Sequence, residues 1–303
     1  MTSSRTVGIA DLSDRAKFAL SGGDRVRFLN GQISNDIRKA DAHLALHACV
    51  LTPKGKMCGD IFVSATDDAL RCDAEPALCE TLAARLERYI IADDVVLRDV
   101  TDEFKLLHAI GIGSEEIDEA GLGGIASVAA NRFGTTGADF WLDAETFGKA
   151  WTSLSARTGV FDSDALEVLR ISAGIPRWGF ELSEDTIPNE AGLDKTSVDY
   201  EKGCYVGQEI ISRLKSIGHV NKTLCGFISR DSRMVSRGAR LFVIDAPTKE
   251  AGWVTSTAFS SALEKSIALG YLKRGVTASE FLAHHLETGE EWVVERASFP
   301  ILS

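Results

Sequence analysis

Apolar positions in the first part of the chain follow both strand and helix periods. Residues 16–21 alternate as a short strand does, and Gly22, Gly23 and Asp24 then introduce a helix. The residues expected on the apolar face of this helix are Val26, Leu29 and Ile33. The order of strand and then helix predicts mixed α and β structure.

The same mixture continues on either side of a turn at Thr52-Pro-Lys-Gly55. Apolar runs at residues 44–50 and 59–64 flank this turn and predict two strands. Pro76 then begins an amphipathic helix that carries Leu82 and Leu86. Another helix is expected over residues 162–174, because Asp162 is a good N-cap and Gly174 a good stop.

After Val220 the pattern becomes β-rich. Short apolar segments separated by turn residues occur at 224–229, 240–244, 252–257, 267–272 and 291–297. They predict a small antiparallel barrel or sandwich. We therefore expect an α+β core of two interleaved sub-domains over residues 1–222 and a C-terminal β-domain over residues 223–303.

Composition narrows the classes of function. The chain has 303 residues, with 44 acids, 33 bases and a net charge of −11. A dedicated nucleic-acid binder needs Lys and Arg to neutralise phosphates, so we expect no direct nucleic-acid partner. The six cysteines form no CxxC pair and show no Cys/His ligand spacing, so we expect no metal site built from this chain alone.

Targeting signals are missing from the sequence pattern. No apolar run approaches the roughly 20 residues that a membrane helix needs. Residues 1–11 lack the apolar stretch of a secretory signal and hold too few arginines for a transit peptide. Reduced cysteines fit an intracellular protein. We expect a cytoplasmic protein without a membrane partner.

Asp60 is the first candidate site residue. It follows the turn at 52–55 and lies between apolar neighbours of the expected strand at 59–64. A carboxylate at such a position can accept a proton from a bound amine or hold a pterin nitrogen. The alternative is a surface or turn-capping aspartate, which is common at strand ends.

Glu190 is a second candidate, because it lies in a loop that Pro176 and Pro188 stiffen. Loops fixed in this way often line sites. The carboxylate of Glu190 can hydrogen-bond a ligand amide or a backbone group. The alternative is a solvated loop acid.

Two glycines bracket the third candidate, Cys204, together with Tyr205, and allow the backbone to approach a ligand closely. Lys202 is two residues from the thiol, and a nearby cation favours the thiolate. Bases outnumber acids from Lys202 to Lys222, so this segment can receive an anionic tail. The alternative is a tight turn with a buried cysteine.

Four runs of the sequence resemble the glycine-cleavage T-protein superfamily. Residues 202–209, Lys-Gly-Cys-Tyr-Val-Gly-Gln-Glu, are similar to the signature of its YgfZ branch of folate-binding proteins. The other runs are 28–37, 170–176 with 187–193, and 252–256 with 267–271. They follow the family's order and spacing over about residues 15–275.

This resemblance implies a cloverleaf of two α+β sub-domains and a C-terminal antiparallel β-barrel around a channel for reduced folate. The implied cofactor is tetrahydrofolate or a one-carbon-substituted folate. Asp60 falls on the second aspartate of the T-protein pattern GGiLDD, and Gly59 replaces the first. Cys204 and Asp60 are the implied catalytic residues, and the implied folate ligands are Asn35, Asp60, Glu190, Lys202 and Tyr205.

Two positions depart from T-proteins. A gapless match places Leu142 where they carry a pterin-binding glutamate, although Asp139 and Asp143 lie close by. Leu166 stands where they carry a folate-binding arginine. A leucine cannot hold a carboxylate, so these departures predict weaker folate binding or a different pose.

The YgfZ branch supports the assembly, repair or activity of iron–sulfur enzymes, including enzymes that modify tRNA. We therefore expect a folate-binding accessory protein with Cys204 as its reactive thiol and iron–sulfur enzymes or their assembly machinery as partners. The alternative is a folate-dependent aminomethyltransferase or other one-carbon transferase. A third class is an interaction scaffold with a vestigial pocket. A transferase shows turnover, an accessory protein binds folate without turnover, and a scaffold does not bind it.

Overall fold

The computed structural model describes residues 7–216 and 218–302. The chain divides into two compact units. Unit 1 comprises Met1–Asp162 and Lys195–Ile210, and unit 2 comprises Ser163–Asp194 and Ile211–Ser303. The predicted fold class is confirmed, because two mixed α/β sheet layers precede a closed antiparallel barrel.

One five-stranded sheet of unit 1 is antiparallel, in the order β3-β4-β5-β2-β6. Its strands are β2 (Ala16–Ser21), β3 (Leu46–Leu51), β4 (Met57–Ala65), β5 (Leu70–Ala74) and β6 (Val96–Asp99). The helical segments between these strands are α1 (Arg25–Gln32), η1 (Ile37–Lys39), η2 (Pro76–Leu78) and α2 (Cys79–Glu87). Leu82 and Leu86 of α2 are buried, as the apolar spacing predicts.

The predicted apolar face of α1 is wrong at one end. Val26 is 39% exposed, whereas Leu29 and Ile33 are fully buried. Ile33 follows the last helical residue in extended backbone, so helical spacing does not set its direction. The short helix buries Phe28 beside Leu29 instead.

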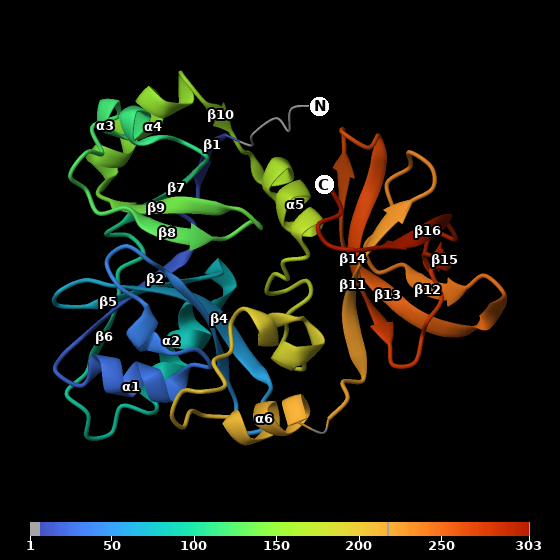
Figure 1. Ribbon diagram of the computed structural model, residues 1–303, viewed down its shortest axis with the longest axis horizontal. Coiled ribbons are helices and arrows are strands. Elements are labelled where there is room, and N and C mark those ends of the chain that lie inside the picture. Colours follow the sequence, from blue (N-terminus) through green and yellow to red (C-terminus); the bar gives the residue numbers. More distant parts are fainter. Residues whose placement is uncertain (1–6, 217, 303) are drawn as a thin grey trace. The chain divides into compact units, whose positions relative to one another are not determined.

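A second five-stranded sheet in unit 1 has the order β10-β1-β7-β9-β8. Its strands are β1 (Gly8–Asp11), β7 (Lys105–Ile110), β8 (Val128–Asn131), β9 (Thr136–Leu142) and β10 (Gly159–Val160). Helices α3 (Ser114–Glu119) and α4 (Ala144–Ser155) accompany this sheet (Figure 1). Ala150 and Leu154 of α4 pack into its core with Phe140.

A buried ion cluster joins the two sheets of unit 1. Arg132, just after β8, donates to both oxygens of Asp73 on β5 at 2.9 and 2.7 Å. The same guanidinium donates to Asp139 on β9 at 2.7–3.0 Å. His108 on β7 lies 2.6 Å from Asp139, and Arg15 pairs with Asp73. Because Arg132 bonds one carboxylate from each sheet, it fixes the sheets against each other.

Unit 2 contains a closed six-stranded barrel in the order β11-β14-β13-β12-β15-β16 (Figure 1). Its strands are β11 (Lys222–Ser229), β12 (Arg240–Val243), β13 (Ala246–Ser260), β14 (Lys265–Lys273), β15 (Glu280–His284) and β16 (Glu291–Ala297). The barrel thus begins at Lys222, close to the predicted boundary. Strand β15 has no counterpart among the predicted segments.

The rest of unit 2 precedes the barrel. Helix α5 (Ser163–Ala173) buries Ile171 in a cluster with barrel residues, and Gly174 ends it with φ +75° as predicted. The remaining helical segments of the chain are η3 (Pro188–Glu190), η4 (Leu193–Lys195) and α6 (Gln208–Ser216). Arg170 of α5 is buried and bonds Glu167, Glu181 and the Ser256 hydroxyl.

Candidate functional site

Asp60 lies on β4 and is 8% exposed. Strand alternation places Gly59 and Ile61 on the core face and Asp60 on the opposite face, together with Phe62. A Cβ on Gly59, the residue that replaces the first aspartate of the T-protein pattern, would lie 2.9 Å from Cδ1 of Leu78 in η2, so the Leu78 side chain would have to shift. Asp60 is therefore the carboxylate that this strand presents away from the core.

Asp60 is held by a histidine that the sequence analysis did not identify. Oδ2 of Asp60 lies 2.9 Å from Nε2 of His47 on the neighbouring strand β3. Nδ1 of His47 lies 2.6 Å from the hydroxyl of Ser197, which is fully buried. A neutral His47 that donates to Asp60 accepts from Ser197. The three side chains form a relay that fixes the orientation of the Asp60 carboxylate.

Asn35 secures the same corner of unit 1. Its amide nitrogen donates to the His47 carbonyl at 3.0 Å, and its oxygen accepts from the Asp36 N–H at 2.9 Å. The side chain is thus used largely within the protein. Through its bond to the His47 carbonyl, Asn35 helps to position β3, the strand that carries His47. The predicted contact of Asn35 with folate stays a prediction.

Four buried polar atoms of unit 1 have no hydrogen-bond partner among the described residues: Nε of Arg25, Nε2 of His108, Oδ1 of Asp60 and the hydroxyl of Tyr205. Oδ1 of Asp60 is the one carboxylate oxygen among these four. Burial also raises the pKa of Tyr205, so its hydroxyl stays protonated. A buried polar atom without a partner is unfavourable by about 1–3 kcal/mol, and such atoms are rare in native structures. An unpaired carboxylate oxygen is an acceptor for a ligand N–H.

Lys202 has a structural position. Its ammonium donates to the carbonyls of Asn30, Ile33 and Asn35 at 2.6, 2.8 and 2.8 Å. All three N–H groups are therefore used, and burial lowers the pKa of Lys202 to about 8. The ammonium ties the Cys204 segment to the end of α1. This arrangement gives no support to Lys202 as a folate ligand or as a free charge beside the thiol.

Cys204 is exposed, in a loop anchored at both sides. Val206 donates its N–H to the Gly31 carbonyl at 3.1 Å. Gly207 has φ +88°, and a side chain there would lie 2.6 Å from the Thr52 carbonyl. The chain segment that supplies Ser197 to the His47 relay thus also presents Cys204 to solvent. The alternative of a buried cysteine in a tight turn is wrong.

Thiol reactivity should follow this difference in exposure. Cys49, Cys72 and Cys225 are buried, and burial raises the pKa of each thiol, as it does for the partly buried Cys79. A pKa raised by one unit lowers the thiolate fraction about ten-fold. We expect iodoacetamide to label Cys204 at least about ten-fold faster than these four, as mass spectrometry of tryptic peptides would show. Labelling of Cys79 or Cys58 before Cys204 would contradict the assignment of Cys204 as the most reactive thiol.

Glu190 belongs to unit 2, in η3, and is 6% exposed. Its carboxylate accepts from the Ile187 N–H at 3.3 Å and lies 3.7 Å from the Lys222 ammonium. Lys222 in turn lies over the rings of Trp253 and Tyr271. Glu190 is therefore not the solvated loop acid of the alternative interpretation. Its contact with folate stays a prediction.

The departure from T-proteins at Leu142 is built into the core, whereas Leu166 on α5 is partly buried. Leu142 on β9 is 2% exposed and belongs to the apolar cluster of its sheet, so it cannot bind a ligand. Asp139 is held by Arg132 and His108, and Asp143 caps α4 by accepting from the Thr146 N–H. Neither nearby aspartate is available to replace the missing glutamate.

The sequence holds one signal for His47. It is the polar residue in an otherwise apolar strand, on the same face as Asp60 when β3 and β4 pair in their observed register. Ser197 gives no such signal, because 150 residues separate it from His47.

Two general properties complete the site's description. Over residues 7–216 and 218–302, no helix has the length and apolar composition to cross a membrane. Within the same ranges, no three His, Cys, Asp or Glu side chains gather as metal ligands.

The C-terminal barrel has a recognisable family. Residues 222–299 match the family described as the glycine cleavage T-protein C-terminal barrel domain. The whole chain is similar to a solved structure, aminomethyltransferase T of the glycine cleavage system from Bartonella henselae. The TM-score is 0.83, with 18% identity over 98% of this chain and 87% of that chain. The two proteins share a fold.

Curated relatives are similar over most of the chain. An aminomethyltransferase of Thermotoga neapolitana is 27% identical, over 92% of this chain and 82% of the relative. A putative chloroplastic transferase of Arabidopsis thaliana is also 27% identical, over 88% of this chain and 66% of the relative. These findings support a place in the T-protein-like superfamily. The narrower assignment to the YgfZ branch stays a prediction.

Proposed function

We propose, on the premise of the T-protein-like fold, that the chain binds a reduced folate through Asp60 and takes part in folate-dependent one-carbon transfer. The observation that carries this proposal is the buried Oδ1 of Asp60, which has no partner among the described residues. The similarity to aminomethyltransferases over 92% of the chain points to the same class of activity.

The residues of unit 1 suit the binding of such a cofactor. Asp60 accepts from a pterin or amine N–H, and its second oxygen remains fixed by His47 at 2.9 Å. Tyr205 offers a protonated hydroxyl as a further donor. Folate, when bound, supplies the nitrogen that carries the one-carbon unit. The relay to Ser197 keeps the Asp60 carboxylate in one orientation, and a fixed group needs no reorganisation when it binds or moves a proton.

A second candidate function is support of iron–sulfur enzymes by a folate-bound accessory protein. Two observations favour it. Cys204 is exposed in an anchored loop, whereas Cys49, Cys72 and Cys225 are buried. The buried Leu142 also removes the pterin-binding glutamate that the resemblance associates with T-protein chemistry. The accessible thiol would then be the group that acts on the client enzyme.

Calorimetric titration with tetrahydrofolate tests the shared part of both functions. We expect saturable binding at one site per chain. A turnover assay, which follows exchange of a one-carbon unit between tetrahydrofolate and an amine donor, then separates the two. Turnover supports the transferase. Binding without turnover, together with reduced iron–sulfur enzyme activity in a Cys204→Ser strain of unchanged protein level, supports the accessory protein. Absence of tetrahydrofolate binding would overturn both and leave the scaffold.

A further inference from the structure

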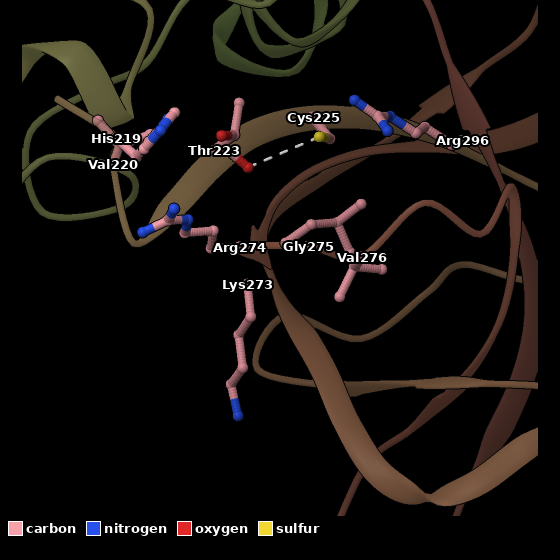
Figure 2. Close-up of a pocket in the computed structure, with 10 residues that line it drawn as sticks. His219, Val220, Thr223, Cys225, Lys273, Arg274, Gly275, Val276 and Arg296 are labelled. Atoms are coloured by element: carbon pink, nitrogen blue, oxygen red, sulfur yellow. Dashed lines mark hydrogen bonds between the residues drawn. The ribbon is translucent and has the colours of Figure 1, made fainter. Parts of the chain in front are cut away.

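The end of the barrel where β11 begins and β14 ends forms a basic pocket within unit 2 (Figure 2). Its volume is about 260 Å³. Among its described lining residues are four basic side chains and no carboxylate: His219, Lys273, Arg274 and Arg296. A cluster of bases without acids is unusual on a chain whose net charge is −11.

Strand alternation explains why these side chains meet. Cys225 on β11, Leu272 on β14 and Val294 on β16 belong to the core of the barrel. The residues two positions nearer this end are Thr223, Arg274 and Arg296, all exposed. Thr223 and Arg296 lie on the same strand faces as Cys225 and Val294, and Arg274 follows the last residue of β14 and extends toward His219 (Figure 2). The N–H of Arg274 donates to the Asn221 carbonyl at 2.8 Å and continues the pairing of β11 with β14 past the end of the strand.

The basic groups of the pocket differ in their partners. Lys273 is paired with Glu250 at 2.8 Å and points away from the other labelled side chains (Figure 2). Arg274 and Arg296 form no ion pair with a carboxylate anywhere in the described part of the chain. Arg296 lies beside Cys225, which also lines the pocket and whose thiol donates to the Thr223 carbonyl at 3.6 Å (Figure 2). Two arginines therefore line the pocket without an anionic partner among the described residues.

We propose that this pocket, lined by Arg274 and Arg296, binds an oxyanion group, the phosphate or carboxylate of a small molecule. A guanidinium presents a planar fork of N–H donors that matches both groups in bidentate geometry. The Thr223 hydroxyl and the His219 ring add donors at the rim. Cys225 lines the pocket as a neutral thiol, because burial raises its pKa. The pocket lies in unit 2, so this proposal stands independently of folate binding at Asp60 in unit 1.

Thermal unfolding of the full chain tests the pocket with two simple probes, inorganic phosphate and succinate, each compared with sodium chloride at equal ionic strength. A ligand that binds only the folded state raises the melting temperature in a saturable way. Each substitution Arg274→Gln or Arg296→Gln removes a charged hydrogen bond and should weaken the apparent Kd at least about ten-fold. Lys249→Gln, which removes an exposed cation from β13 outside the pocket, should leave the Kd unchanged.

The two probes identify the chemistry of the ligand. Saturable stabilisation by phosphate assigns a phosphorylated ligand, and stabilisation by succinate assigns a carboxylate. The proposal would be overturned if neither probe exceeds sodium chloride in the unmodified protein. It would also be overturned if the Arg274→Gln/Arg296→Gln variant responds as the unmodified protein does, because the effect would then be general screening.

Discussion

Replacing Arg132 by methionine should destabilise the protein by about 3–5 kcal/mol, the usual effect of removing one partner from a buried ion pair. The side chains of Arg132, Asp73 and Asp139 are at most 3% exposed. Methionine fills most of the volume but leaves two buried carboxylates without their shared cation. Urea denaturation measures the change. As a control, Arg98→Met removes an exposed pair with Glu103, so its effect should be below about 1 kcal/mol.

The difference in unfolding free energy between the unmodified protein and Arg132→Met should depend on pH in one direction. Burial alone raises the pKa of Asp139, but Arg132 and His108 lower it to about 2 in the folded protein. The pKa of Asp73 is lowered as well, because Arg132 and Arg15 outweigh its burial. A carboxyl with a depressed pKa stabilises the fold above its unfolded pKa of about 3.9, and this stabilisation is lost as the pH falls toward 2. The gap between unmodified protein and Arg132→Met should therefore narrow below about pH 4. An unchanged gap would contradict the ion-cluster account.

Replacing Lys202 by methionine should have the second-largest effect on stability, about 2–3 kcal/mol. The substitution leaves three carbonyls without their donor, those of Ile33 and Asn35, which are buried, and that of Asn30, which is partly buried. The substitution also removes the unfavourable burial of a charged ammonium, the effect that lowers the pKa of Lys202. This gain offsets part of the lost stability. Because this ammonium ties the Cys204 loop to α1, limited proteolysis should also cleave near residue 204 sooner in the variant.

The matched control for Lys202 is Lys39→Met. Lys39 pairs with Asp199 in the same segment at 2.5 Å, but its side chain is 61% exposed. An exposed pair contributes about 0–1 kcal/mol, so this variant should keep the loop protected from proteolysis. Equal effects of the two substitutions would mean that charge near the loop, rather than the three carbonyl bonds, holds it in place.

Much of the fold could be predicted because its signals are local. Turn residues and apolar periods indicated β2, β4 and α5. Short apolar segments separated by turn residues predicted the barrel over about the last 80 residues. Strand β10, with two residues, is too short to leave a period. Val26 was misplaced because α1 is only eight residues long, so its packing and not its spacing decides which residues are buried.

The candidate site, like the fold, was predictable from the sequence only where its signals are local. The strand pattern and the resemblance identified Asp60, whose neighbours are local. The partners of its carboxylate come from β3 and from Ser197, far away in sequence, so only the fold brings them together. Lys202 was interpreted from its nearness to Cys204 along the chain. In the structure, the carbonyls at the end of α1 offer a better partner to the ammonium than a neighbouring thiol does.

The most direct test of the central claim, that the free oxygen of Asp60 holds a reduced folate, is calorimetric titration of Asp60→Asn with tetrahydrofolate. The amide keeps the size of the side chain and an oxygen for His47, but removes the charge that accepts a ligand N–H. Loss of a charged hydrogen bond predicts a Kd at least about ten-fold weaker, with little change in melting temperature. Asp67→Asn, at an exposed position just after the same strand, should bind as the unmodified protein does. Equal affinity in all three proteins would contradict the assignment of Asp60.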